Sequence, residues 1–88
     1  MEICFEEIFG KDLRKVNDKK LLKKVENIIT EVKGAKTLND IRNVEKLKGY
    51  ETYYRIRIGS YRVGVDFIEG RVIFTRFLHR KDIYRYFP

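Results

Sequence analysis

The longest hydrophobic pattern in the chain has the period of an α-helix. Between Lys19 and Lys33 the apolar residues recur at positions i, i+1, i+4, i+7, i+8 and i+11, and so form one continuous stripe: Leu21, Leu22, Val25, Ile28, Ile29 and Val32. The lysines of this segment fall mainly on the opposite, solvated side. Asp18 is suited to cap the start and Gly34 to end it. The pattern therefore predicts an amphipathic helix over residues 18–33.

A shorter helix is predicted before it, beginning near Ile8, because Phe9, Leu13 and Val16 have helical spacing. Asn17–Asp18 interrupts the pattern, so the two helices should form an antiparallel hairpin. The apolar residues 1–5 read as a short strand that precedes the hairpin. Residues 35–46 are polar and allow only a short helical turn.

The second half of the chain alternates with the period of a β-strand. Three strands are predicted at about 52–58, 61–68 and 71–78, separated by tight turns at Gly59–Ser60 and Glu69–Gly70. Residues 83–87 read as one terminal helical turn. No linker divides the chain, so residues 1–88 should be a single α+β domain. Its helical hairpin should pack on one face of a twisted antiparallel sheet, the three-strand meander.

The alternation also predicts which side chains share a face of this sheet. The apolar sets should meet the helices, because a slip of one residue would bury several arginines. If Ile73, Thr75 and Phe77 of the third strand pack on the helices, Arg76 lies beside Arg62 on the open face. The open face would then gather a cluster of like charges: Arg55, Arg57, Arg62 and Arg76. The alternative is that each arginine pairs with one of three acids, Glu51, Asp66 or Asp82.

The net charge of the chain limits the kinds of partner that it is expected to bind. The net charge is +7 and the isoelectric point about 9.6, which favours a polyanion such as RNA, DNA, an acidic protein or an anionic membrane surface, against simple solubility. Seven of the nine arginines but one of the eleven lysines lie after residue 48. Arginine's planar fork suits phosphate groups, so the second half is the expected binding half.

The remaining composition excludes several kinds of site. A single cysteine and a single histidine form neither an internal disulfide nor a zinc site, and they fit a reducing cytoplasm. No signal peptide or apolar run of membrane-spanning length is present. We expect a cytoplasmic protein with no membrane, metal or cofactor partner.

The open face suits a reaction in which RNA supplies the reacting group. The open face offers no pair of nucleophile and base, whereas RNA supplies its own nucleophile, the 2′-hydroxyl. Arginines can stabilise charge on phosphoryl oxygens, and Tyr84 can stack on a base. A lysine or His79 is a candidate for proton transfer. His79 and Tyr84 each have a structural alternative. His79 could pack under the last turn, and Tyr84 could close the edge of the core.

Four segments and Arg57 together resemble the RelE/ParE superfamily of type II toxins. The segments are Leu47-Lys48-Gly49, Tyr54-Arg55, Gly59-Ser60-Tyr61-Arg62-Val63 and His79-Arg80-Lys81-Asp82-Ile83-Tyr84. The resemblance covers the whole chain. It implies a ribosome-dependent endoribonuclease that cuts mRNA in the A site and is neutralised by a co-encoded antitoxin. One departure is that the chain ends at Pro88 without a long C-terminal helix.

The resemblance also implies roles for residues. Arg62, Arg80 and Tyr84 match the family's catalytic residues, and Lys46 and Lys48 match lysines associated with proton transfer and rRNA contact. The expected catalytic set is Arg62, Arg80, Tyr84, Lys48 and His79; the expected RNA-binding set is Lys46, Arg55, Arg57, Arg76 and Arg85.

Two other functions fit the same pattern. One is a ParE-like toxin that inhibits DNA gyrase by protein–protein contact, without cutting nucleic acid. The other is an inactive, purely RNA-binding relative. The arginine-rich open face and the closing His-Arg-x-x-x-Tyr segment favour the endoribonuclease.

Overall fold

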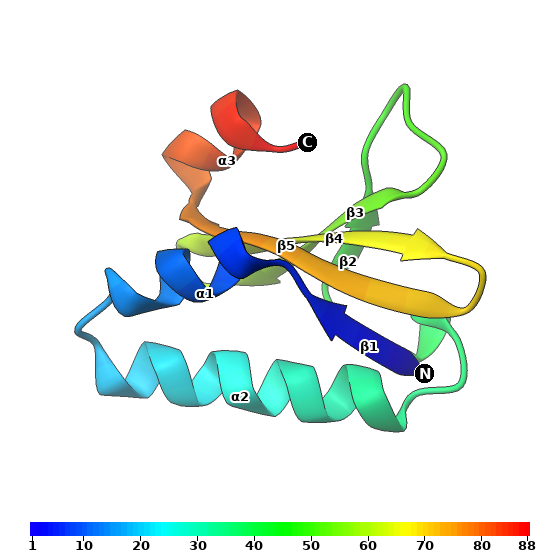
Figure 1. Ribbon diagram of the computed structural model, residues 1–88, viewed down its shortest axis with the longest axis horizontal. Helices are drawn as coiled ribbons and strands as arrows, with labels where there is room; N and C mark the ends of the chain where they lie inside the picture. The colour runs from blue at the N-terminus through cyan, green and yellow to red at the C-terminus, as the bar shows by residue number, and fades with distance from the viewer.

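The computed structural model describes residues 1–88, which form one five-stranded sheet with helices on both faces (Figure 1). In chain order the elements are β1 (Glu2–Phe5), α1 (Glu7–Arg14), α2 (Lys19–Gly34), the 3₁₀ turn η1 (Leu38–Asp40), β2 (Val44–Lys46), β3 (Tyr53–Ile58), β4 (Tyr61–Ile68), β5 (Arg71–His79) and α3 (Arg80–Tyr86). The predicted α+β class, helical hairpin, meander and terminal helix are confirmed.

The sheet is larger than the predicted meander. Its strand order is β1-β5-β4-β3-β2, and the pairing of β1 with β5 is parallel, so the sheet is mixed rather than purely antiparallel. The helical turn expected within residues 35–46 is limited to η1, and β2 then pairs with β3. Three residues are too few for a strand to be recognised by alternation.

The α1–α2 hairpin covers one face of the sheet and buries the main core. Asp18 caps α2 as predicted, because its Oδ1 accepts a hydrogen bond from the Leu21 backbone N–H at 3.1 Å. The residues that are fully buried in this core are Phe9, Val32, Ile56, Val63, Val65, Val72, Phe74 and Phe77. None of the helices is long and apolar enough to cross a membrane.

A β-bulge changes the predicted register of β5. Val63 lies opposite Phe77, but Val65 lies opposite Phe74, so Thr75 is an extra residue. Its hydroxyl donates a hydrogen bond to the Gly64 carbonyl at 2.8 Å. The prediction that Phe77 faces the helices is confirmed. The prediction for Ile73 and Thr75 is wrong, because the bulge shifts the alternation and sends Phe74 to the core instead.

A buried carboxylate fixes α1 against β5. Asp12 is 3% exposed, and its Oδ2 accepts hydrogen bonds from the Phe77 backbone N–H at 2.9 Å and from Arg76 Nε at 2.8 Å. Its Oδ1 accepts a further bond from Arg76 Nη2 at 3.1 Å. These hydrogen bonds raise the pKa of Arg76 above its ordinary value, although burial opposes them. The prediction that Arg76 is a free cation beside Arg62 is therefore wrong.

The opposite face of the sheet carries a second, smaller core beneath α3 (Figure 1). Ile83 and Phe87 are buried there with Leu47. The Phe87 ring lies directly over Gly64, where an added Cβ would be 2.8 Å from three ring atoms. The absence of a side chain at this position in β4 therefore lets the end of the chain pack flat on the sheet.

We expect Asp12→Asn to lower the free energy of unfolding by about 2–3 kcal/mol, because it leaves a half-buried guanidinium without its counter-charge. Urea denaturation measures this change. The control is Glu26→Gln, which removes an exposed carboxylate paired with Lys23 at 3.3 Å and should cost under about 0.5 kcal/mol. Equal losses in the two variants would contradict a structural role for Asp12.

We expect Gly64→Ala to undock the C-terminal segment, because its methyl group would overlap the Phe87 ring. Overpacking of this kind costs about 1–3 kcal/mol. Hydrogen exchange should show loss of protection in α3 while α2 stays protected. Gly10→Ala is the control, since the nearest atom to its added Cβ is the end of the Arg14 side chain at 3.5 Å. Unchanged exchange in α3 would overturn the role given to Gly64.

Candidate functional site

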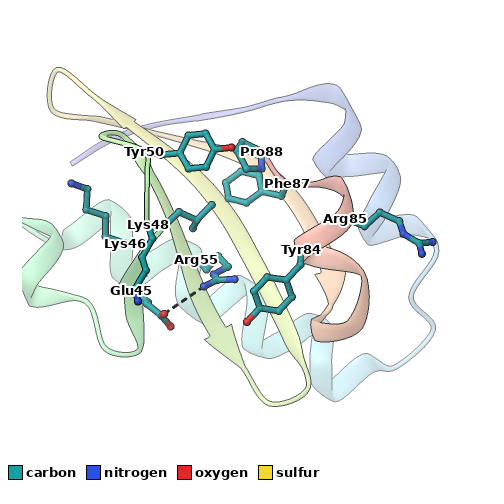
Figure 2. Close-up of a pocket in the computed structure, with 10 residues that line it drawn as sticks. Glu45, Lys46, Lys48, Tyr50, Arg55, Tyr84, Arg85, Phe87 and Pro88 are labelled. Atoms are coloured by element: carbon teal, nitrogen blue, oxygen red, sulfur yellow. Dashed lines mark hydrogen bonds and ion pairs between the residues drawn. The ribbon is translucent and has the colours of Figure 1, made fainter.

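A hollow of about 480 Å³ lies between α3 and the strands β2 and β3 (Figure 2). Its basic lining comes from the end of β2 and the residues after it, from β3, and from α3. The lining residues are Glu45, Lys46, Leu47, Lys48, Tyr50, Arg55, Tyr84, Arg85, Phe87 and Pro88. Phe87 is thus both a wall of this hollow and an anchor of α3.

Arg55 and Tyr84 form the centre of this hollow. The Arg55 guanidinium lies over the Tyr84 ring, with its carbon 4.5 Å from the ring centroid (Figure 2). Glu45 lies opposite Arg55 in the β2–β3 ladder and pairs with it at 3.4 Å. The Tyr84 side chain is otherwise free, since the residue is 72% exposed. One ring face is therefore held by a cation while much of the side chain stays open to solvent.

A second hollow of about 340 Å³ adjoins the first and shares Glu45, Arg55 and Tyr84 with it. It adds Arg57 and Arg62, which face each other across the β3–β4 ladder. We call the two hollows together the cationic groove. Six basic residues line it against a single acidic one, Glu45.

Arg62 has no carboxylate partner. Its Nη1 donates hydrogen bonds to the carbonyls of Gly59 and Tyr61, both at 2.9 Å. Arg57 is similar, since its Nη2 contacts only the Asn43 Oδ1, at 3.3 Å. Two neighbouring guanidiniums without an acid between them favour an anionic ligand.

Most of the expected site residues are brought together in this groove. The structure places Lys46, Lys48, Arg55, Arg57, Arg62 and Tyr84 along it. Arg85 is on its border, but Figure 2 shows that side chain directed away from Tyr84, on the far side of α3. Arg76 lies outside, in its ion pair with Asp12.

His79 is also outside the groove. It lies opposite Tyr61 on β4, and the two rings meet edge to face with centroids 5.4 Å apart. Its Nδ1 accepts a hydrogen bond from the Lys81 backbone N–H at 3.1 Å, so the imidazole caps α3. This arrangement is close to the structural alternative for His79, and no hydrogen bond joins its side chain to Arg62 or Tyr84.

Arg80 begins α3 and is exposed. Its backbone N–H donates to the Ser60 carbonyl at 2.8 Å, which ties the start of α3 to the β3–β4 turn. Its side chain lines neither hollow of the cationic groove. The backbone of Arg80 therefore helps to position α3.

Several groove residues were not among the expected site residues, and two of them, Glu45 and Phe87, shape the site. Glu45 would have been recognised as the partner of Arg55 if residues 44–46 had been read as a strand. Phe87 gave no signal, because neither the spacing nor the composition of the last residues shows that the chain folds back over Gly64.

A family model described as the ParE toxin of type II toxin–antitoxin systems matches residues 4–84. The match covers nearly the whole chain, so the protein belongs to this family of toxins. It is therefore the toxin of a type II toxin–antitoxin system.

Similar proteins refine this assignment. The chain is 44% identical to Toxin RelE3 of Methanocaldococcus jannaschii over 89 residues, which cover 100% of both chains. It is also 43% identical to a chain in a RelB–RelE antitoxin–toxin complex from Methanococcus jannaschii, with a TM-score of 0.81 over 97% of this chain and 99% of that one. The RelBE complex of E. coli shares the fold at 22% identity, with a TM-score of 0.69 over 89% and 94% of the two chains. The toxin is thus of the RelE type, the mRNA-interferase branch that the sequence resembles.

Proposed function

We propose that this toxin cleaves mRNA on the ribosome, and that the cationic groove is where the scissile phosphate binds. The observation that carries the proposal is the pairing of two unneutralised arginines, Arg57 and Arg62, with an exposed tyrosine in one groove. Guanidiniums bind phosphate and tyrosine stacks on bases, so the groove has the donors that an RNA strand requires.

The groove suits a reaction in which the RNA attacks itself. The 2′-hydroxyl of one nucleotide gives up its proton to a base, and its oxygen forms a bond to the adjacent phosphorus. The bond from that phosphorus to the 5′-oxygen breaks, and the 5′-oxygen takes up a proton from an acid, so no net proton is gained or lost. Arg62 is held by the β4 ladder and by two carbonyls, so its guanidinium is preorganised for the charge on the phosphoryl oxygens. Lys46 and Lys48 are the basic groups of the groove that we assign to proton transfer and to contact with rRNA.

Tyr84 and Arg55 orient the strand in this proposal. A base stacked on the open side of Tyr84 would place the ring between that base and the Arg55 guanidinium. Fixing an unstacked nucleotide in this way favours in-line attack by the neighbouring 2′-hydroxyl.

The second proposed partner is a cognate antitoxin. The similar chain from Methanococcus jannaschii was solved with its antitoxin RelB. An antitoxin segment with acidic side chains over the cationic groove would neutralise the same arginines that bind RNA. Binding of antitoxin and binding of RNA should then compete.

We expect Arg62→Ala to slow single-turnover cleavage of mRNA on ribosomes by about 10²–10³-fold, because one preorganised donor to the phosphoryl oxygens is lost. The loss of stability should stay below about 1 kcal/mol, since Arg62 forms no ion pair. Arg62→Lys should restore activity only in part, because an ammonium lacks the planar fork.

The control is Arg71→Ala, which removes an exposed arginine paired with Glu2 at 3.6 Å and outside the groove. It should cleave at the rate of the unchanged protein. A folded Arg62→Ala protein that cleaves as fast as the control would exclude Arg62 from the mechanism and favour a toxin that does not cut RNA.

We expect Tyr84→Ala to weaken binding of single-stranded RNA about tenfold, because a stacking platform is lost, and Tyr84→Phe to bind normally. Fluorescence anisotropy with a labelled oligonucleotide measures this. Tyr86→Ala is the matched control, since Tyr86 is an exposed tyrosine of the same helix that does not line the groove. Equal affinity of the Tyr84→Ala variant and this control would rule out stacking on Tyr84.

A further inference from the structure

A third hollow, of about 280 Å³, borders the cationic groove at the end of β3. It is formed by Lys24 and Glu31 of α2, by Arg42 and Asn43 of the loop before β2, and by Arg57. Asn43 and Arg57 also line the groove, so the two are continuous. A basic path therefore leads from Arg62 around the end of the sheet to the exposed side of α2.

The cations of this third hollow are unpaired. Lys24 and Arg42 are exposed, and neither side chain forms an ion pair or a hydrogen bond. Lys23, the neighbour of Lys24 on α2, pairs with Glu26 instead. The acid of the hollow, Glu31, uses its Oε2 to accept a hydrogen bond from the Arg42 backbone N–H at 3.2 Å. Glu31 thus fixes the loop without forming an ion pair with a cation.

The loop that carries Arg42 is held at both ends. Asn43 has a left-handed backbone, with a φ of 62°, a conformation that asparagine tolerates better than most residues. Its carbonyl accepts a hydrogen bond from the Arg57 backbone N–H at 3.0 Å, while Glu31 binds the preceding residue. Arg42 is therefore presented from a fixed position beside Arg57, rather than from a free loop.

We propose that Lys24 and Arg42 form a phosphate-binding subsite for an RNA backbone that continues beyond the cationic groove. This inference rests on the proposed function, since Arg57 joins the subsite to the groove. Its lining is mainly polar, with only Ile28 and Ile58 apolar, whereas a peptide partner would need an apolar anchor. The phosphates belong either to the message next to the cleaved bond or to ribosomal RNA.

The test is the double variant Lys24→Ala/Arg42→Ala against the double control Lys20→Ala/Lys36→Ala, which removes equal charge from exposed positions outside the hollow. One arm measures binding of single-stranded RNA oligomers of increasing length, made with 2′-O-methyl groups so that they lack the nucleophile and are not cut. The other arm measures binding to ribosomes without mRNA. Urea denaturation confirms that both variants are folded.

We expect the subsite variant to bind about 20-fold more weakly than the control at 0.1 M salt, the order that two lost phosphate contacts give at this salt concentration. Its salt dependence should be shallower by about 1.4 in logarithmic slope, since two phosphate contacts are lost. A loss confined to the longer oligomers assigns the subsite to the message, and a loss confined to ribosomes assigns it to ribosomal RNA.

Equal affinities of the subsite variant and the control in both arms would overturn the subsite and leave the groove's role intact. Binding of an acidic antitoxin is measured in parallel with both arms. A subsite variant that loses affinity for the antitoxin but in neither arm would overturn the subsite too, in favour of a protein partner. If the unchanged protein binds neither oligomers nor ribosomes, the proposed function itself fails.

Discussion

The site depends on the packing of α3 against the face of the sheet that the α1–α2 hairpin leaves open. Ile83 and Phe87 bury that helix, and Phe87 lies flat because Gly64 has no side chain beneath it. The docked helix brings Tyr84 over Arg55 and closes one wall of the groove. Without this small second core, the arginines of β3 and β4 would lie on an open surface with no tyrosine beside them.

The distribution of acids explains why the groove remains basic in a chain that has thirteen of them. Asp12 is used in the core, where it holds Arg76 and the edge of β5. Glu45 neutralises one cation of the groove, Arg55, and orients it toward Tyr84. The other cations that line the groove without a carboxylate partner include Arg57, Arg62, Lys46 and Lys48. In this fold Arg76 forms a structural ion pair with Asp12, whereas Arg57 and Arg62 line the groove where a ligand can reach them.

The sequence predicted the longer helices and strands because their periods are strong, but not the three-residue strand β2. It predicted the face of Arg57 and Arg62 because the turn between β3 and β4 fixes their register. It did not predict the fate of Arg76. An extra residue in β5, Thr75, shifts the alternation, and the partner Asp12 lies 64 positions away in the chain. Local sequence patterns predict neither the bulge nor the pairing of Arg76 with Asp12. The position of Tyr84 could not be predicted for the same reason, since it depends on a long-range contact with Arg55 of β3.

The central claim is that the groove stabilises an attack made by the RNA itself. The most direct measurement is cleavage on ribosomes of two messages that differ by a single 2′-deoxy nucleotide at the cut. We expect the unmodified message to yield a 2′,3′-cyclic phosphate and the deoxy message to stay intact, because its nucleophile is missing. Cleavage of the deoxy message at an equal rate would contradict the claim, since the nucleophile would then come from the protein or from water.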